Sequence, residues 1–586
     1  MKNFIQRNIL LAILLALATT TWAQDAEVAV PKWGSKVQKS LVSLIAYDQN
    51  HEMIHEGTAA FVSDNGVAVA DYALLRDAYS AIVVTADGKK LDVSRILGAD
   101  DTYGVVKMQI DTKKSTPLTF ASSTSGTSGT RTFAILYQKD KLTKCPSTPV
   151  AKKEIVEEKY AYYTLQTAFD NKYTGAFLFD EQGNCLGIVQ SPIAEHSYAI
   201  DAAYAFDRKI TPIPSKAETM ALNNIHILKG LPDSKEEALV YLFFKSKSAG
   251  NDEYLDLLNL FIDTWPDVAE GYLRRATPLM DTHRFEEADR DLKTYLKLAD
   301  DPMAANANVA DAIYNKLRFL PEETYEPWTY DLAIQHIDKA LTLAKGNVSA
   351  AKDEATRKEA ENVVLQFQLQ KALILTGKGD HQAAIDIYDE LNAGPHRSPS
   401  IFYAASMAHE ALGDSLSVPI ALMDSALAMF PDPMPADAAN YVMRRGQLLA
   451  AAGRYREAVL DYNKYCYLNN NRVTADFYYD RFLLEKQARM YQQALDDIDL
   501  AIGQAPREPL YYVERSALQL MVGQTDECIE SARQCLALDP QNSDAYRIMG
   551  YAQIQKGDKT SARQNLQRAV ELGDPNAQEL IDKFLK

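Results

Sequence analysis

The sequence predicts a multidomain fold in which an all-β region is followed by an all-α superhelix. From residue 32 to residue 214, short β-branched and aromatic runs are interrupted by Gly, Asp, Asn and Ser, as in a protein of many short strands. From residue 235 to residue 586, helical patterns recur with a period of about 34 residues. A chain of 586 residues is long enough for roughly three or four domains of ordinary size.

Residues 1–23 are expected to form a secretory signal. Lys2 and Arg7 precede the apolar run Ile9–Ala18, and small residues lead up to a cleavage point after Ala23. A membrane anchor is disfavoured because the run is too short to span a bilayer comfortably. No later segment is long and apolar enough to span a membrane. We therefore expect an exported chain, in the periplasm, the extracellular space or the cell envelope.

The composition disfavours nucleic acid as a partner. The formal net charge is −17, and nucleic-acid binding depends on cationic contacts with phosphates. The contents of hydrophobic residues (47%) and charged residues (24%) are ordinary for a globular protein. Protein or peptide partners remain the expectation.

The five cysteines are too few for a disulfide framework in a chain of this length. No two of them have C-x-x-C spacing, so the sequence predicts no metal site, and no cofactor is expected. Cys145 and Cys185 are candidates for one disulfide bond, and the sequence leaves this pairing open. Cys528 and Cys535 lie seven residues apart on a predicted helix, where we expect buried small residues.

Two hairpin patterns mark the β region. The stretch TADGKKLDV has an Asp-Gly pair between alternating runs, which is a strong hairpin pattern. The stretch FLFDEQGNCLGIV is expected to turn near Gln182, Gly183 and Asn184. Many short strands with closely spaced turns predict a sandwich or barrel from 32 to 214. After them, prolines and polar residues predict a linker over residues 215–234.

In the helical region, small or apolar residues recur at fixed offsets. One constant spacing separates Ala494, Cys528 and Ala562, then Ile498, Ala532 and Leu566, then Ala501, Cys535 and Ala569. This pattern resembles the tetratricopeptide repeat, in which each unit is a pair of helices. The resemblance implies about eight or nine units between residues 235 and 586. One unit cannot bury its own apolar face, so the units are expected to stack.

The β region resembles a trypsin-like serine protease domain of the secreted HtrA type. The resemblance lies in GTAAFVSDNGVAVADYALLRDA, ILGADDTYGVVKMQI and YTGAFLFDEQGNCLGIV. Their order and spacing are similar to those of the segments that carry the family's catalytic histidine, aspartate and serine. The resemblance implies two β-barrels. The full expectation is thus an all-β trypsin-like double barrel followed by an all-α tetratricopeptide superhelix.

All three catalytic positions depart from the family pattern. The histidine falls on Ala73, the aspartate on Thr102 and the serine on Thr174. Alanine cannot accept a proton, and a threonine at position 102 brings no charge to orient an imidazole. We therefore expect an inactive homologue of trypsin-like serine peptidases. Such a barrel can still pair an extended peptide with the edge of a groove.

Other polar residues of the β region are expected to have structural roles. His51, His55 and His196 are expected in turns or on the surface, away from the family's base position. Asp100 and Asp101 are expected in a solvated turn.

The first helices of the repeats are expected to form the binding surface, because stacked helix pairs present them on the inner side of a superhelix. Arg274, Arg275, Arg444 and Arg445 add local positive charge, which suits a carboxylate ligand. The alternative is that these arginines pair within the protein. By position in the repeat, the candidate partner-binding residues are Asn440, Arg444, Gln447, Tyr479, Arg547 and Tyr551.

Together the patterns predict an exported, non-catalytic scaffolding protein whose superhelix and degenerate protease-like domain bind peptides or protein partners. One alternative is an active secreted serine/threonine-type endopeptidase, which a hydrolysis assay would reveal. The other is a carbohydrate-linked envelope protein, because the 32 tyrosines suit stacking on sugars as well as packing.

Overall fold

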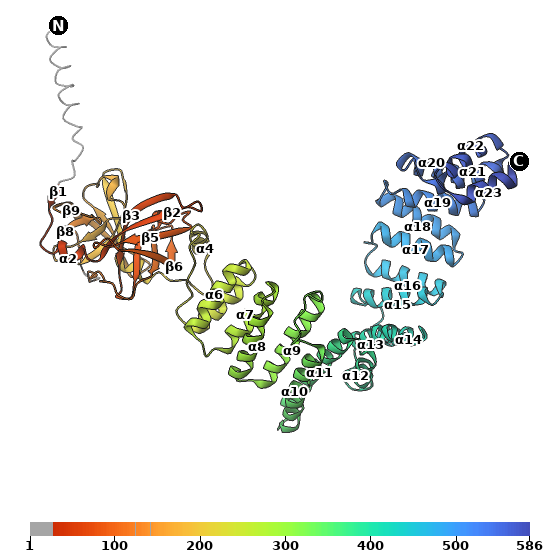
Figure 1. Cartoon of the computed structure of the whole chain (residues 1–586), viewed down its shortest axis with the longest axis horizontal. Helices are drawn as coiled ribbons and strands as arrows, with labels where there is room; N and C mark the ends of the chain where they lie inside the picture. Colours follow the sequence, from red (N-terminus) through yellow and green to blue (C-terminus); the bar gives the residue numbers. More distant parts are fainter. Residues whose placement is uncertain (1–26, 123–124, 141) are drawn as a thin grey trace, which may run out of the picture. The chain divides into compact units, whose positions relative to one another are not determined.

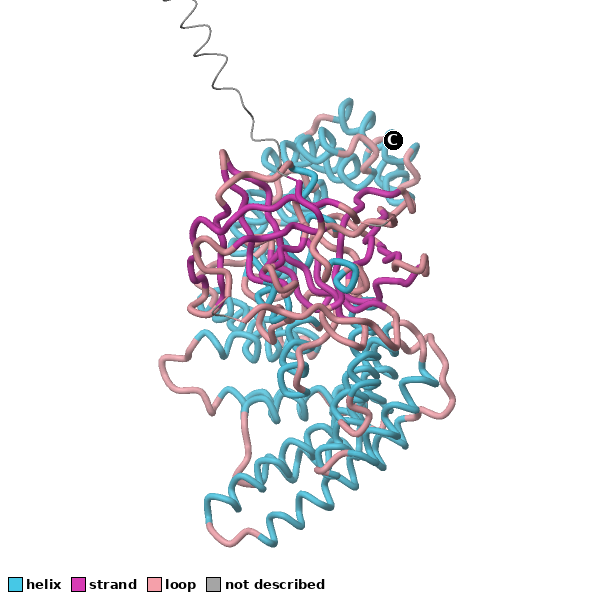
Figure 2. The backbone as a smooth tube through the Cα atoms, turned by 90° about the vertical axis from the view of Figure 1, so that its left-hand side faces the viewer, coloured by secondary structure: helices cyan, strands magenta, loops and turns pink. Residues whose placement is uncertain are grey.

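The computed structural model describes residues 27–122, 125–140 and 142–586. The expected secretory signal, residues 1–23, lies outside the described residues. The chain divides into two compact units: an N-terminal unit that ends at Asp300 and a C-terminal unit from Asp301 to Lys586. The named strands all belong to the N-terminal unit, whereas the C-terminal unit is built of helices (Figure 1, Figure 2).

Six antiparallel strands close the first barrel in the order β2-β3-β4-β7-β6-β5. Pairing of β2 with β5, where Leu44 lies opposite Val83, completes the ring. Leu44, Val83 and Met108 are fully buried, because side chains that alternate along each strand point into the barrel. The strands are β2 (Leu41–Tyr47), β3 (Met53–Phe61), β4 (Val67–Asp71), β5 (Ser80–Val84), β6 (Lys90–Asp100) and β7 (Val105–Ile110).

The second barrel has the strand order β9-β10-β13-β12-β11-β8, and pairing of β8 with β9 closes it. Strand β1 pairs with the first three residues of β9. Phe177, Phe179 and Tyr204 are fully buried in its core. The expected double barrel is therefore confirmed. The strands are β1 (Glu27–Ala29), β8 (Arg131–Ile135), β9 (Lys144–Val156), β10 (Tyr160–Leu165), β11 (Phe177–Phe179), β12 (Cys185–Ile193) and β13 (His196–Asp201).

The hairpin between β11 and β12 turns at the expected residues. Asp180 Oδ1 accepts hydrogen bonds from the N–H groups of Gln182 (2.9 Å) and Asn184 (2.8 Å). Gly183 has a φ of +85°, a conformation that favours glycine. A β-carbon on Gly183 would lie 2.7 Å from the ring of Trp33. Both the turn geometry and this close packing therefore require glycine.

Cys145 on β9 and Cys185 on β12 are both buried, free thiols in the core of the second barrel. The disulfide bond that the sequence left open is not formed in this structure. Burial raises the pKa of Cys145 to about 11, and it also raises the pKa of Cys185. Neither thiol has the thiolate character of a reactive cysteine at neutral pH.

The segment 215–234 was expected to be a linker, but it is folded onto the first barrel. It contains α4 (Lys216–Asn223), whose Ala221 and Leu222 are buried in the barrel core. Tyr72 of the barrel donates a hydrogen bond to the carbonyl of Ala221 at 3.1 Å. The sequence pattern missed this helix because flanking prolines and polar residues obscure a short amphipathic stretch.

The first helix pair also packs on the first barrel. Tyr241 of α5 (Lys235–Lys245) and Phe261 of α6 (Asn251–Thr264) belong to the same apolar core as the barrel strands. Arg95 of β6 forms a bidentate ion pair with Asp256 of α6, at 2.6 and 2.9 Å. The β region and the start of the helical region therefore share one core within the N-terminal unit.

Helix pairs follow one another through the rest of the chain (Figure 1). Helices α17, α19 and α21 begin at residues 475, 509 and 543, which reproduces the period expected from the sequence. In the N-terminal unit the helices are α2 (Gly34–Val37), α3 (Ala202–Asp207), α4, α5 (Lys235–Lys245), α6 (Asn251–Thr264), α7 (Ala269–Asp281) and α8 (Phe285–Leu298). In the C-terminal unit they are α9 (Pro302–Phe319), α10 (Tyr330–Ala350), α11 (Glu354–Lys378), α12 (His381–Ala393), α13 (Pro399–Leu412), α14 (Ser417–Leu427), α15 (Ala439–Ala451), α16 (Tyr455–Leu468), α17 (Ala475–Gln487), α18 (Tyr491–Gln504), α19 (Pro509–Met521), α20 (Thr525–Leu538), α21 (Ser543–Lys556), α22 (Lys559–Glu571) and α23 (Pro575–Phe584).

The small repeat positions lie where the helices approach one another. Ala494, Cys528 and Ala562 are completely buried. Burial raises the pKa of Cys528 to about 12 and that of Cys535 to about 11. Both cysteines therefore act as small core residues of α20, as expected.

Within residues 27–122, 125–140 and 142–586, no helix combines the length and apolar content that a membrane crossing requires. The same described residues contain no cluster of three or more His, Cys, Asp or Glu side chains arranged to hold a metal ion.

Candidate functional site

The three expected catalytic positions lie in neighbouring turns of the N-terminal unit. Ala73 belongs to the short helix η1 (Tyr72–Leu74), and the N–H of Tyr72 donates to the carbonyl of Gly104 at 3.0 Å, beside the turn that carries Thr102. Thr174 follows the short helix η2 (Asn171–Tyr173). A β-carbon on the adjacent Gly175 would lie 3.3 Å from Cβ of Asp71. The fold thus brings η1, the Thr102 turn and the Thr174 turn together.

The backbone of the Thr174 turn is hydrogen-bonded within the protein. An oxyanion hole needs free N–H groups beside the nucleophile. In residues 172–175 every N–H has an acceptor: Lys172 donates to Asp170 Oδ1 (2.9 Å), Tyr173 to Asp170 O (2.9 Å), Thr174 to Asn171 O (3.0 Å) and Gly175 to Val189 O (2.8 Å). In this conformation, the turn presents no free N–H donor to a developing oxyanion.

Asp71 is a titratable residue beside this turn that was not predicted as a site residue from the sequence. Its Oδ1 caps η1 by accepting a hydrogen bond from the N–H of Ala73 at 2.8 Å. Burial raises the pKa of Asp71, and the hydrogen bond from Ala73 opposes that rise. The position of Asp71 at the end of β4, just before a turn, is the signal that would have found it.

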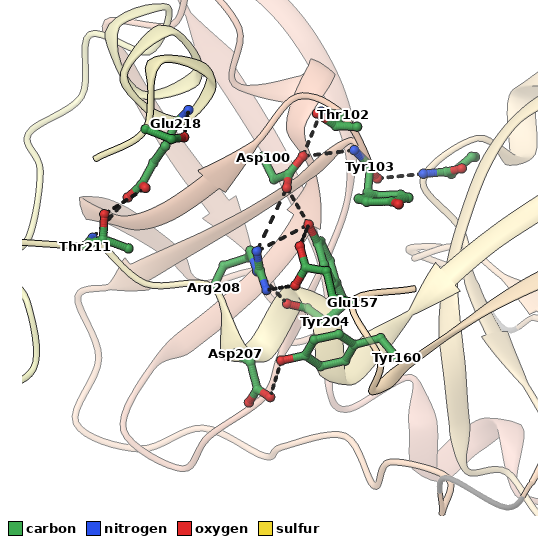
Figure 3. A network of polar contacts seen from close by, with 12 residues as sticks. Asp100, Thr102, Tyr103, Glu157, Tyr160, Tyr204, Asp207, Arg208, Thr211 and Glu218 are labelled. Carbon is green, nitrogen blue, oxygen red and sulfur yellow. Dashed lines mark hydrogen bonds and ion pairs between the residues drawn. The ribbon is translucent and has the colours of Figure 1, made fainter. Parts of the chain in front are cut away.

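Asp100 lies in a network and not in a solvated turn, so that expectation was wrong (Figure 3). Its carboxylate accepts hydrogen bonds from the N–H groups of Thr102 (2.7 Å) and Tyr103 (3.0 Å) and from the hydroxyl of Tyr204. Asp101 is exposed and pairs with Arg76 at 2.7 Å. The turn with Thr102 is therefore held to α3 through Asp100 and Tyr204.

The side chain of Arg208 continues this network beyond α3 (Figure 3). Its guanidinium lies 3.9 Å from the ring centre of Tyr204 and forms an ion pair with Glu157 at 3.2 Å. Tyr160 donates to Asp207 at 2.7 Å. Burial, followed by the bond to the Asp100 carboxylate, raises the pKa of Tyr204, so its hydroxyl stays a donor. The network joins the first barrel to the helix that follows the second.

The three histidines of the β region lie on two strands and in one turn. His55 is exposed on β3, and His51 lies in the turn before it. His196 Nδ1 lies 2.8 Å from the carbonyl of Leu165. In the described part of the chain, none of the three has a hydrogen bond to Thr174.

A cavity of about 360 Å³ lies between α4, α5 and the N-terminus of α6. Lys229 lines it and donates to the carbonyls of Ile225 and Ile227, both at 2.6 Å. Burial lowers the pKa of Lys229 to about 8. Because two of its N–H groups bind backbone carbonyls, we interpret Lys229 as a residue that orders this loop.

A second hollow, of about 410 Å³, lies between α13 and α15, which are the first helices of two successive helix pairs in the C-terminal unit. It brings together three of the predicted partner-binding residues, Asn440, Arg444 and Gln447, which share one side of α15. Ser400 and Tyr403 of α13 form another wall. We call the surface that runs from these residues onto the equivalent positions of α17 and α19 the first-helix face.

The amides of Asn440 and Gln447 have no hydrogen-bond partner among the described residues, and both side chains are exposed. Arg444 pairs with Glu410 of α13, and its Nε is buried without a partner in the described part of the chain. Tyr403 meets the ring of Tyr441 at a centroid distance of 5.7 Å. The hollow therefore combines free neutral amides with aromatic walls.

The other predicted partner-binding residues lie further along the stack. Tyr479 on α17 packs against Tyr511 at a ring distance of 5.2 Å. Arg547 on α21 pairs with Asp574 at 2.6 Å and also with Asp544. Tyr551 packs edge-on against Phe584 of α23 at 5.9 Å. These three side chains are partly occupied by contacts within the protein and do not line the hollow.

The arginine pairs noted in the sequence are bonded internally. Arg274 pairs with Glu270 at 2.7 Å, and Arg275 and Arg445 each bind both oxygens of an aspartate sixteen residues later. The same spacing joins Arg481 to Asp497 at 2.6 and 2.7 Å. The guanidinium groups of Arg275, Arg445 and Arg481 tie the two helices of a pair together, whereas Arg274 pairs within α7. Internal pairing was the alternative interpretation.

No family model matches the chain. The Small glutamine-rich tetratricopeptide repeat-containing protein 2 of Mycosarcoma maydis is 32% identical over 98 residues, which are 17% of this chain and 27% of that protein. The Hsp70-Hsp90 organizing protein 2 of Arabidopsis thaliana is 32% identical over 92 residues, 16% of each chain. The chain therefore spans about a quarter or less of the length of these relatives.

Among solved structures, the chain matches an HtrA-type protease, AlgW with a decapeptide. The sequence identity is 17% and the TM-score is 0.25. The match covers 29% of this chain and 63% of that one.

Proposed function

We propose that this protein is an exported, non-catalytic scaffold that binds protein partners on the first-helix face of its C-terminal unit. In this proposal the partner presents an extended peptide segment. The double barrel is a folded module that has kept a protease-like core without peptidase chemistry.

The hollow between α13 and α15 is the observation that carries the proposal. It has a volume of about 410 Å³ and two exposed amides, Asn440 and Gln447, with free donors and acceptors. A side-chain amide offers both a donor and an acceptor, as a peptide bond does, so it suits recognition of a main chain. Stacked helix pairs commonly bind partners on such a surface.

The curated relatives support a protein partner. One is named for tetratricopeptide repeats, and the other is named as an organizing protein for Hsp70 and Hsp90. Both matches cover a small part of those proteins, so the identity of the partner is not carried over.

The absence of catalysis is supported by the Thr174 turn. The N–H groups of residues 172–175 all have acceptors, and a methyl group stands at Ala73 where a general base would be needed. Export is supported by the charged, apolar and small-residue sections of residues 1–23. N-terminal sequencing of the protein from the culture fluid or the envelope fraction tests the export part directly.

Selection of a random peptide library against the immobilised full chain tests the binding function. We expect enriched peptides whose affinity, measured by fluorescence anisotropy, falls about tenfold in Asn440→Ala/Gln447→Ala. The reason is that the hydrogen bonds lost with the two amides cost roughly 1.4 kcal/mol, which corresponds to a factor of ten. The control is Gln493→Ala/Gln567→Ala, which removes two exposed amides from the second helices α18 and α22. A library without any enriched peptide contradicts the proposal.

A further inference from the structure

The first-helix face changes its charge along the stack. On α13 and α15 the residues around the hollow are neutral, apart from Arg444, which Glu410 neutralises. On α17 the equivalent positions are occupied by Asp476 and Asp480. The face therefore passes from neutral amides and tyrosines to two carboxylates over one helix pair.

Both basic residues of α17, Arg481 and Lys486, are already paired. Lys486 on α17 binds Glu514 on α19 at 2.6 Å. Asp476 accepts a hydrogen bond from the hydroxyl of Tyr511 at 3.0 Å, which leaves its charge in place. Asp480 is exposed and has no ion pair among the described residues. The two aspartates thus leave a net negative charge on α17.

Aromatic contacts hold this part of the face rigid. Tyr465 stacks on Phe477 at a ring distance of 5.4 Å, which links the wall of the hollow to α17. Tyr479 stacks on Phe482 at 5.8 Å and packs against Tyr511 at 5.2 Å. The hollow and the carboxylates are therefore joined by packed rings, and a ligand meets both on one preorganised surface.

We propose that the ligand of the first-helix face is an extended peptide that is uncharged where it crosses α13 and α15 and carries a lysine or arginine where it crosses α17. This inference rests on the proposed function and adds the chemistry of the partner. The amides of Asn440 and Gln447 bind its main chain, and the carboxylates of Asp476 and Asp480 receive its cation.

The spacing of the surface predicts where the cation falls. Neighbouring helices pack about 8–10 Å apart, and an extended chain advances about 3.3 Å per residue. The basic residue therefore falls about three residues from the segment that lies in the hollow. Desolvation, together with the charge of Asp476, raises the pKa of Asp480. A bound cation therefore offsets a repulsion between the two carboxylates that is already present in the free protein.

The test uses the peptides selected against the full chain. We expect lysine or arginine to be enriched about tenfold at one position, and the neighbouring positions to exclude aspartate and glutamate. For one such peptide, the lysine is replaced by norleucine, which keeps the methylene chain and removes the charge. Affinities of both peptides are then measured for the wild type, for Asp476→Asn/Asp480→Asn and for the control Asp496→Asn/Glu527→Gln, whose exposed carboxylates lie on α18 and α20.

We expect Asp476→Asn/Asp480→Asn to weaken binding of the lysine peptide about tenfold and to leave binding of the norleucine peptide unchanged, while the control variant binds both as the wild type does. Enriched peptides without a basic position, or an equal loss for both peptides, overturn the inference and leave the proposed function standing. Failure to enrich any peptide, or binding of glycans in place of peptides, overturns both.

Discussion

The turn that carries Thr174 and the hollow on the first-helix face differ in what their polar groups bind. In the turn, the N–H groups of residues 172–175 all have acceptors inside the protein. In the hollow, the amides of Asn440 and Gln447 are exposed and free within the described chain. A binding site needs polar groups that are still available to a ligand, and of these two regions of the described chain the hollow has them.

The same contrast occurs inside the C-terminal unit. Arg481 has a largely satisfied guanidinium, which binds both oxygens of Asp497 and also the side chain of Asn463. Such groups stabilise the stack, whereas the free amides of the hollow contribute little to folding.

The largest expected effect is on stability, in Arg481→Ala. Arg481 and Asp497 are 11% and 6% exposed, so the substitution leaves a buried carboxylate without its partner. We expect the free energy of unfolding to fall by about 3–5 kcal/mol, measured by urea denaturation with far-UV circular dichroism. The control is Arg456→Ala on α16, an exposed arginine without an ion pair in the described chain. Equal losses in the two variants would contradict the structural role of Arg481.

The second effect is a gain in stability in Glu485→Gln. Glu485 is 3% exposed, and its Oε2 has no hydrogen-bond partner in the described chain. Burial, followed by the charge of Asp497, raises the pKa of Glu485 to about 8. One period later, Gln519 and Ser531 occupy the equivalent positions and form a neutral hydrogen bond at 2.7 Å. A glutamine at 485 therefore places here the neutral side chain that the next repeat already has at the equivalent position.

The pH dependence of this gain follows from the direction of the shift. Below a pH of about 4.5 both folded and unfolded states hold the Glu485 proton, so the group has no effect there. Between about 4.5 and 8 the unfolded state loses the proton first, so wild-type stability falls as pH rises, and above 8 the loss is constant. We expect Glu485→Gln to be more stable by about 3 kcal/mol at pH 7, with little difference near pH 4.5. Urea denaturation at both pH values measures this, and a gain independent of pH would contradict it.

The fold was largely predictable because it rests on periodic patterns. The constant spacing of Ala494, Cys528 and Ala562 predicted helices that begin one repeat apart, and close packing buries all three. The segment 215–234 was not predictable in this way. Its α4 is a helix of eight residues whose burial depends on the barrel beneath it, which the local pattern does not contain.

The candidate site was predictable in part. Asn440, Arg444 and Gln447 were expected on one helix side, and helical periodicity brings them into one hollow. The internal pairing of Arg445 with Asp461 was harder to foresee, although a spacing of sixteen residues between arginine and aspartate is visible in the sequence. The hydrogen bonds made by the N–H groups of residues 172–175 could not be predicted from the sequence, because backbone hydrogen bonds depend on turn geometry and not on residue type.

The third effect is on binding and not on stability. Asn440→Ala/Gln447→Ala is expected to weaken peptide binding about tenfold and to change the free energy of unfolding by less than about 0.5 kcal/mol. The reason is that both amides are exposed and free in the described chain. Anisotropy titration and urea denaturation of the same samples measure both quantities. Loss of stability in parallel with binding would show that the amides are structural after all.

The smallest expected effect is on hydrolysis. Wild type, Thr174→Ala and Asp71→Asn are all expected to cleave fluorogenic peptides at the rate of buffer alone. Wild-type cleavage that Thr174→Ala abolishes would establish an endopeptidase. The Thr174 turn would then be a functional site, in contradiction to its contrast with the hollow.

A restored triad sharpens this test, because it supplies every catalytic side chain. In Ala73→His/Thr102→Asp/Thr174→Ser the N–H groups of residues 172 and 174 still donate to Asp170 and Asn171. Stabilisation of the oxyanion is therefore still missing, and removal of a single such donor costs about 100- to 1,000-fold in turnover in known enzymes. We expect no measurable hydrolysis from this variant. Hydrolysis by the restored triad would mean that the turn can release its N–H groups, so that the three substituted side chains, and not the hydrogen-bonded backbone, are what prevents catalysis.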